Sequence, residues 1–154
     1  MCPRKFHRGL TPGGGVLYIQ LMSTRRTALH IGSECLVMRA RRLARRLTRI
    51  YDEELRGLGI GSAQLNLLVT IGAGGPLRAS DIGDYLDIEK STLSRTLGRL
   101  QVEGLVEAED QHLRLTPAGE RVLSDVRPAW QRAQARAARE LGKDLTQALS
   151  DIPR

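Results

Sequence analysis

The sequence predicts a mainly α-helical fold with one short β-hairpin, and three observations lead to this prediction. Apolar residues recur at spacings of three and four over most of the chain, which places them on one face of a helix. Aromatic residues make up only 3% of a chain that is 41% apolar, so its core has to be built from Leu, Val and Ala, whereas sheet proteins usually hold more aromatic alternation. Two short strand-like runs, 105–108 and 112–115, flank three polar residues, which is the pattern of a hairpin. At 154 residues we expect one domain with a sizeable core.

The first 61 residues divide into a leader and a long helix. We expect 1–30 to be a flexible leader, because Pro and Gly punctuate its first half. Two interpretations of 1–21 stay open: it is a disordered tail, or it is an upstream extension and Met22 rather than Met1 is the true start. Residues 31–61 are expected to form an N-terminal helix over 34–58, with an apolar stripe along one face and a row of arginines along another.

Residues 62–116 show the order helix, helix, turn, helix, hairpin. Ser62 is a suitable N-cap for the first of these helices, which we expect over 63–71. The second ends near Leu86, a tight connection follows, and the third covers about 90–103. Three leucines mark the apolar face of this third helix: Leu93, Leu97 and Leu100. A hairpin directly after it completes the pattern of a winged helix-turn-helix.

Residues 117–154 are expected to form the C-terminal helices. Thr116 and Pro117 give the N-cap and the first turn of a long helix. Pro128 should kink this helix, and Gly142 should divide it from a short last one. Both flanking helical segments are longer than a winged helix needs for its own core, so their apolar stripes need another partner, and a second copy of the chain is the simplest one. The predicted fold is therefore mainly α: a winged helix-turn-helix with a short β-hairpin wing, flanked by long N- and C-terminal dimerisation helices.

The sequence contains no pattern typical of a metal site, a disulfide framework, a catalytic centre or a membrane span. Its cysteines, Cys2 and Cys35, lack metal-ligand spacing, so we expect a reducing, cytoplasmic location and neither a metal nor a cofactor. No run reaches the ~18 apolar residues that a membrane span needs. No nucleophile lies in a pattern with a His and an acid, and 13–15 is not a phosphate loop, because no Lys-Ser/Thr follows. The chain is therefore not predicted to be an enzyme.

The face of the 90–103 helix that lies opposite its leucines carries small hydroxyls and cations. Such groups reach phosphates and base edges, and small side chains allow close approach to a DNA major groove. Net charge alone is weak support for DNA binding. The whole chain carries +7, but residues 76–116 hold five Lys and Arg against eight Asp and Glu. DNA binding by this segment therefore depends on a few placed groups rather than on gross charge.

Three stretches of the chain resemble one known family. They are DIEKSTLSRTLGRLQVEGLV at 87–106, LRLTPAGERVL at 113–123 and RLTRIYDEELRGLGIGSAQLNLL at 46–68. Over about 35–149 the chain resembles the MarR family of bacterial winged-helix regulators. The resemblance implies a homodimer, joined through its N- and C-terminal helices, that binds a pseudo-palindromic operator in double-stranded DNA. It also implies repression that a small ligand or an oxidant relieves.

The resemblance also assigns DNA-facing positions. The residues that match the family's groove-facing helix are Lys90, Ser91, Thr92, Ser94, Arg95 and Arg99. We expect Ser91, Thr92 and Arg95 to lie nearest the bases. Lys90 and Arg99 should hold phosphates. Two alternatives stay open: Thr92 is partly buried, and Arg99 is solvated or ion-paired.

The wing departs from the family pattern. Family wings are usually longer and have an Asp-x-Arg tip whose Arg enters the minor groove. Here the hairpin is short and its tip, 109–111, is acidic, so phosphates would repel it. Arg114 and His112 are the nearby substitutes for the missing cation. Arg114 is equally well explained as a residue on the face of its strand.

Two regulatory interpretations and one alternative remain. Arg42 and Arg46, on the helix over 34–58, would attract the carboxylate of a small anionic or phenolic effector. Cys35 would serve as a redox sensor, as in one branch of the family, with Tyr51 as a hydroxyl that holds it. The cysteine is shifted by about two residues from the family position, and a lone cysteine on an apolar helix face is more often inert packing. The alternative to regulation is a winged-helix protein-interaction module, which the net acidic DNA-reading segment and the short wing favour.

Overall fold

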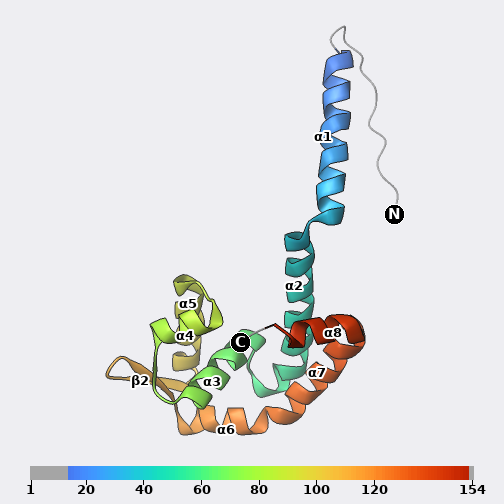
Figure 1. Cartoon of the computed structure of the whole chain (residues 1–154). Coiled ribbons are helices and arrows are strands. Elements are labelled where there is room, and N and C mark those ends of the chain that lie inside the picture. Colours follow the sequence, from blue (N-terminus) through green and yellow to red (C-terminus); the bar gives the residue numbers. More distant parts are fainter. Residues whose placement is uncertain (1–13, 153–154) are drawn as a thin grey trace. The chain divides into compact units, whose positions relative to one another are not determined.

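The computed structural model of the chain describes residues 14–152, and it divides into two compact units with the boundary between Ala44 and Arg45. The first contains α1 (Gly14–Glu34) and the start of α2 (Leu36–Leu55), which continues into the second unit (Figure 1). The other elements, all in the second unit, are a 3-10 turn (Arg56–Leu58), α3 (Ser62–Gly74), β1 (Leu77–Arg78), α4 (Ala79–Leu86), α5 (Lys90–Val102), β2 (Val106–Glu109), β3 (His112–Leu115), α6 (Pro117–Asp125), α7 (Arg127–Leu141) and α8 (Lys143–Ser150).

Helix α1 occupies residues that the sequence predicted to be flexible. Residues 1–13 of the expected leader lie outside the described residues, but 14–30 are helical, so the prediction is wrong there. The Pro and Gly residues that suggested flexibility all precede Val16, and 16–31 contain neither, so nothing in this segment breaks a helix. The predicted domain boundaries at 30, 61 and 116 stay predictions.

Aliphatic side chains form the core of the second unit. Leu68 of α3, Ile82 of α4 and Leu100 of α5 are completely inaccessible to solvent. Leu93 and Leu97 of α5 are buried with them, which confirms the predicted apolar face of this helix. Helix α3 lies between α5 on one side and α6 on the other (Figure 1) and packs against both. This packing fixes the buried face of α5 and leaves its opposite face in solvent.

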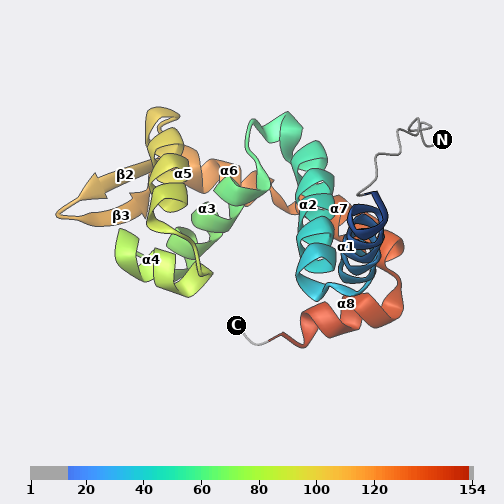
Figure 2. The same ribbon diagram turned by 90° about the horizontal axis from the view of Figure 1, so that it is seen from above.

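A three-stranded antiparallel sheet forms the wing, in the order β1-β3-β2. The hairpin of β2 and β3 was predicted, but β1 was not, because two residues are too few to form a recognisable strand pattern. The turn is also shorter than predicted: Glu109 belongs to β2 and pairs with His112. Asp110 and Gln111 alone form the turn, with φ of 47° and 65°, the left-handed backbone that a two-residue hairpin turn with both central residues at positive φ requires. The mainly α-helical winged fold is confirmed, and Figure 2 shows its hairpin projecting beside α5.

The helix ends follow the sequence with one exception. Thr116 caps α6 as predicted, since its Oγ1 accepts from the Gly119 N–H at 3.1 Å. Pro128 separates α6 from α7 and lies in the first turn of α7, where its missing N–H costs nothing. Ser62, however, is not the N-cap of α3: Gly61 is, and the Ser62 N–H donates to Asp52 Oδ1 at 2.7 Å. A carboxylate from α2 therefore replaces the expected hydroxyl at this helix start.

Candidate nucleic-acid interface

Helices α4 and α5 form a helix-turn-helix with a tight, left-handed connection. Asp87 ends α4 with φ of 50°, and the Ile88 N–H donates to Gly83 O at 3.0 Å. A Cβ atom on Gly83 would lie 3.3 Å from a methyl of Leu93, so the glycine lets the two helices pack closely. At the start of α5, the Glu89 carbonyl oxygen accepts from the N–H groups of Thr92 at 2.9 Å and Leu93 at 3.0 Å. The turn thus sets the direction in which α5 leaves α4.

The exposed face of α5 carries all six residues predicted to contact DNA. They are Lys90, Ser91, Thr92, Ser94, Arg95 and Arg99, and each is exposed. Exposure of Thr92 decides against its partial burial. Arg99 is exposed and forms no ion pair with any residue of 14–152, so it is not the ion-paired residue of the alternative, and its phosphate contact stays a prediction. The structure therefore brings small hydroxyls and cations together on one solvent-facing surface.

Arg95 lies back along its own helix. Its Nε donates to Ser91 O at 3.2 Å, and an Nη donates to Thr92 Oγ1 at 3.4 Å. Both bonds are long and exposed, so they hold the guanidinium weakly. Thr96 is tied into the helix, because its hydroxyl donates to Thr92 O at 3.0 Å. Arg95 is consequently held near the hydroxyl-bearing first turns of α5, where a new acceptor can replace its present ones.

The wing holds its arginine differently. Arg114 lies directly opposite Glu107 in the sheet register. Its Nε is 2.9 Å from Glu107 Oε1, and its Nη1 is 2.6 Å from Glu109 Oε2. Arg114 lies on the face of its strand between these two carboxylates, and its contact with DNA stays a prediction. His112 turns its Nδ1 toward Asp110 O at 2.8 Å, within the hairpin.

Sequence reasoning missed a link between α5 and the start of α3. Gln64 Nε2 donates to Glu103 Oε2 at 2.7 Å, and Gln64 Oε1 accepts from the Gly61 N–H at 2.9 Å. Gln64 is the third residue of α3, a position where Gln commonly caps its own helix. The capping half of this arrangement was therefore readable from the sequence, but the contact with the C-terminal end of α5 was not.

Comparisons with known proteins identify the family. The family model described as the HVO_A0261 N-terminal domain matches residues 53–138, more than half of the chain. The transcriptional regulator MosR of M. tuberculosis is 30% identical to the chain, with a TM-score of 0.69, and the match covers 79% of this chain and 92% of MosR. The chain belongs to this domain family and to the MarR family of transcriptional regulators.

Two further structures and one curated protein are similar to this MarR-family chain. The transcriptional repressor CouR, solved with p-coumaroyl-CoA, is 22% identical with a TM-score of 0.70, over 79% of this chain and 91% of CouR. A cysteine-to-serine variant of E. coli MarR in complex with operator DNA is 21% identical with a TM-score of 0.67, over 78% of this chain and 92% of MarR. The uncharacterized HTH-type transcriptional regulator YwoH of Bacillus subtilis (strain 168) is 33% identical over 64 residues, 42% of this chain. That match spans only 47% of YwoH. The family consists of transcriptional regulators rather than enzymes, in agreement with the prediction from the sequence.

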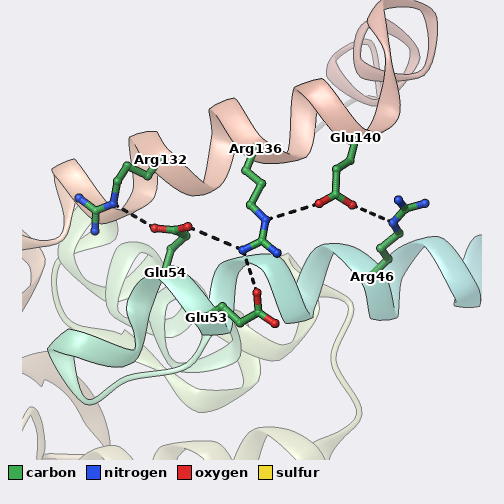
Figure 3. Close-up of polar contacts among 6 residues, drawn as sticks. All are labelled: Arg46, Glu53, Glu54, Arg132, Arg136 and Glu140. Carbon is green, nitrogen blue, oxygen red and sulfur yellow. Dashed lines mark hydrogen bonds and ion pairs between the residues drawn. The ribbon is translucent and has the colours of Figure 1, made fainter.

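The arginines predicted to hold an effector lie in different surroundings. Arg42 is exposed on α2, in the first unit. Arg46, in the second unit, is 2.9 Å from Glu140 Oε2 of α7 and belongs to an ion-pair ladder between α2 and α7 (Figure 3). The ladder consists of Arg46, Glu53, Glu54, Arg132, Arg136 and Glu140. An anion that binds Arg46 therefore has to compete with Glu140.

The redox prediction rests on two residues that the structure describes separately. Cys35 is a free, half-buried cysteine at the break between α1 and α2. Tyr51 is partly buried on α2, and desolvation raises the pKa of its phenol. A redox role of Cys35 stays a prediction. Within 14–152, no group of three His, Cys, Asp or Glu side chains is placed to bind a metal ion, and no helix is long and apolar enough to cross a bilayer.

Proposed function

We propose that the chain is a repressor that binds a pseudo-palindromic DNA operator as a homodimer and places α5 of each copy in the major groove. The observation that carries this proposal is the exposed face of α5. Over residues 90–99 its exposed groups are small or cationic, whereas the opposite face, with Leu93, Leu97 and Leu100, is buried in the core. A helical segment with this division can enter a groove about 12 Å wide with its apolar face still buried in the protein. The DNA-bound MarR structure supports the proposal, because its fold is shared over most of the chain.

The residues of α5 divide into two proposed roles. Ser91, Thr92 and Arg95 contact base edges, since they lie in the first two turns of α5, which a recognition helix inserts deepest. Lys90 and Arg99 hold phosphates at either end of the same face. None of the three cations of α5 forms an ion pair with another residue of 14–152, so each is available to DNA.

The first unit supports the proposal of a homodimer. Its α2 begins with an apolar run that stays exposed: Leu36 by 76%, Val37 by 62% and Met38 by 54%. A contiguous apolar surface of this kind marks an interaction site rather than a solvated face. A second copy of the chain would cover it and present two α5 helices about one turn of DNA apart, ~34 Å.

We further propose that a small anionic effector relieves repression and that Arg42 and Arg46 attract it. CouR supports this part of the proposal, as a repressor solved with the anionic thioester p-coumaroyl-CoA. In this chain the effector would take Glu140's place beside Arg46, which links its binding to the α2–α7 ladder. A protein of this function acts on chromosomal DNA, so we propose a cytoplasmic location.

The proposal is tested with an operator obtained by selecting DNA duplexes on the purified protein. We expect a two-fold symmetric footprint and an affinity that falls steeply with salt. Arg95→Ala should weaken operator binding roughly 5- to 150-fold, the effect of about 1–3 kcal/mol from one lost base contact. Arg121→Ala is the matched control, because Arg121 is exposed on α6, on the other side of α3 from α5. Circular dichroism should show both variants folded.

Two outcomes would contradict the proposal. Equal losses from Arg95→Ala and Arg121→Ala would mean that α5 does not read the DNA. A wild-type protein that binds no duplex even at low salt would favour the protein-interaction module, for which the ion-paired wing arginine is the supporting observation.

A further inference from the structure

The wing contains a three-residue ion-pair cluster, Glu107–Arg114–Glu109, which we call the wing triad. One guanidinium lies between two carboxylates, at 2.9 Å from Glu107 and 2.6 Å from Glu109. The two strands hold this arrangement, since Glu107 and Arg114 face each other directly and Glu109 lies two residues further along the same face of β2. All three side chains are about half exposed or more, so the triad lies on the surface of the wing.

The charges of the triad do not cancel. Two carboxylates and one guanidinium leave a net charge of −1, and Asp110 at the exposed turn adds another negative charge beside them. A phosphate that approaches Arg114 meets both carboxylates as well, because they lie against its Nε and Nη1. Arg114 is the only cation of β2, the turn and β3 when His112 is neutral, and both of its ion pairs are with carboxylates. The three cations of α5, in contrast, form no ion pair with another residue of 14–152.

We propose that Glu107 and Glu109 withhold Arg114 from phosphates, so that the wing lowers the affinity of the protein for DNA of every sequence. This inference rests on the proposed function of the chain as a DNA-binding regulator. Phosphate contacts raise affinity for every sequence alike, whereas base contacts discriminate. Withholding a phosphate contact at the wing therefore lowers the affinity for operator and non-operator DNA by the same factor, and leaves discrimination between them to Ser91, Thr92 and Arg95.

The test compares binding to the selected operator and to a scrambled duplex over a range of salt concentrations. The variant is Glu107→Gln with Glu109→Gln, which keeps the shape of both side chains and removes their charge. We expect binding to the scrambled duplex to rise on the order of tenfold at low salt, and its dependence on salt to steepen by about one, as for one added phosphate contact. Operator binding should rise by a similar factor, so the ratio of the two affinities stays the same.

Arg114→Gln separates this inference from the simpler one in which Arg114 already binds a phosphate. If Arg114 is withheld in the wild type, Arg114→Gln leaves the salt dependence unchanged. A salt dependence that becomes shallower by about one would overturn the inference. Adding Arg114→Gln to the double variant should return its salt dependence to the wild-type value, because the freed cation is gone.

A matched control removes the same charge elsewhere. Asp144→Asn with Asp151→Asn neutralises two exposed carboxylates at α8 and should change binding to either duplex less than twofold. An equal gain from this control would overturn the inference, and so would a gain of the wing variant that is confined to one of the two duplexes. Unchanged binding of the wing variant to both duplexes would also overturn it. That result would not contradict the proposed function as long as the wild type binds the operator. A wild type that binds neither duplex overturns both.

Discussion

The winged-helix core and the α2–α7 ladder hold the second unit together by different physical means. Around Leu68, Ile82 and Leu100 the side chains are completely inaccessible, and no polar side chain of the described residues is buried. Between α2 and α7 a row of partly exposed ion pairs joins the two helices (Figure 3). The first depends on removing apolar surface from water, and the second depends largely on charges that salt screens.

The difference has a functional meaning for a DNA-binding protein. The core positions α5 and should be insensitive to ions, since apolar burial carries no charge. The ladder joins α2 to α7 and takes in Arg46, one of the arginines proposed to attract an effector. Ions and anionic ligands therefore act on the ladder and not on the core. The apolar core that positions α5 is therefore separate from the α2–α7 junction, which ions can affect.

The largest expected effect comes from breaking the core. Leu68→Ala should lower the free energy of unfolding by about 2–5 kcal/mol, because the side chain is fully buried and its removal leaves a cavity. The loss should be the same at low and high salt. Val69→Ala, at the adjacent position of α3 and 46% exposed, is the matched control and should cost much less. Denaturant unfolding at two NaCl concentrations measures both, and similar losses in the two variants would show that the core is not packed as described.

A smaller effect is expected from the ladder. Glu54→Gln removes the carboxylate that lies 3.0 Å from Arg132 Nε and 3.8 Å from Arg136 Nη1. The variant should lose at most about 1 kcal/mol of stability, because partly exposed ion pairs are individually weak. Unlike the core variant, it should approach the wild type as NaCl is raised toward 1 M. Glu120→Gln on α6 is the control for the loss of a charge alone. If the loss of stability in Glu54→Gln did not depend on salt, the core and the ladder would not differ in the way proposed.

The sequence predicted the core better than the ion pairs, for a physical reason. The spacing of Leu93, Leu97 and Leu100 is a property of one helix, so it can be read from a single segment. Helix α7 likewise shows Arg132, Arg136 and Glu140 four residues apart, but nothing in that spacing says that α2 lies alongside. Periodicity therefore gives the face of an element, while its partner requires the fold.

In the wing, an error of one residue in the predicted turn changes which side chain faces Arg114. The predicted hairpin, with strands 105–108 and 112–115, pairs residue 108 with 112 and so places Val106 opposite Arg114. The structure pairs Glu109 with His112, which shifts the register by one and places Glu107 opposite Arg114 instead. Such a shift exchanges the faces on which side chains meet. The left-handed pair Asp110 and Gln111 decides the turn length, and neither residue is the Gly that usually signals it.

The smallest effect concerns Tyr51, which lies where the two regions meet. It is on α2, next to the ladder residues in sequence, but its ring packs against the core cluster. Burial raises the pKa of its phenol above the ordinary value of 10. Below pH 10 both the folded and the unfolded chain keep the proton, so stability does not depend on this group.

Above pH 10 the unfolded chain releases the Tyr51 proton first. The folded chain then binds more protons than the unfolded one, and its stability falls as the pH rises toward the raised pKa. Tyr51→Phe should flatten this alkaline decline, measured as the melting temperature between about pH 8 and 11. Tyr85→Phe, at a 63% exposed position, is the control. An unchanged decline in Tyr51→Phe would mean that α2 does not hold this phenol in the core, and that the boundary between packing and charge lies elsewhere on the helix.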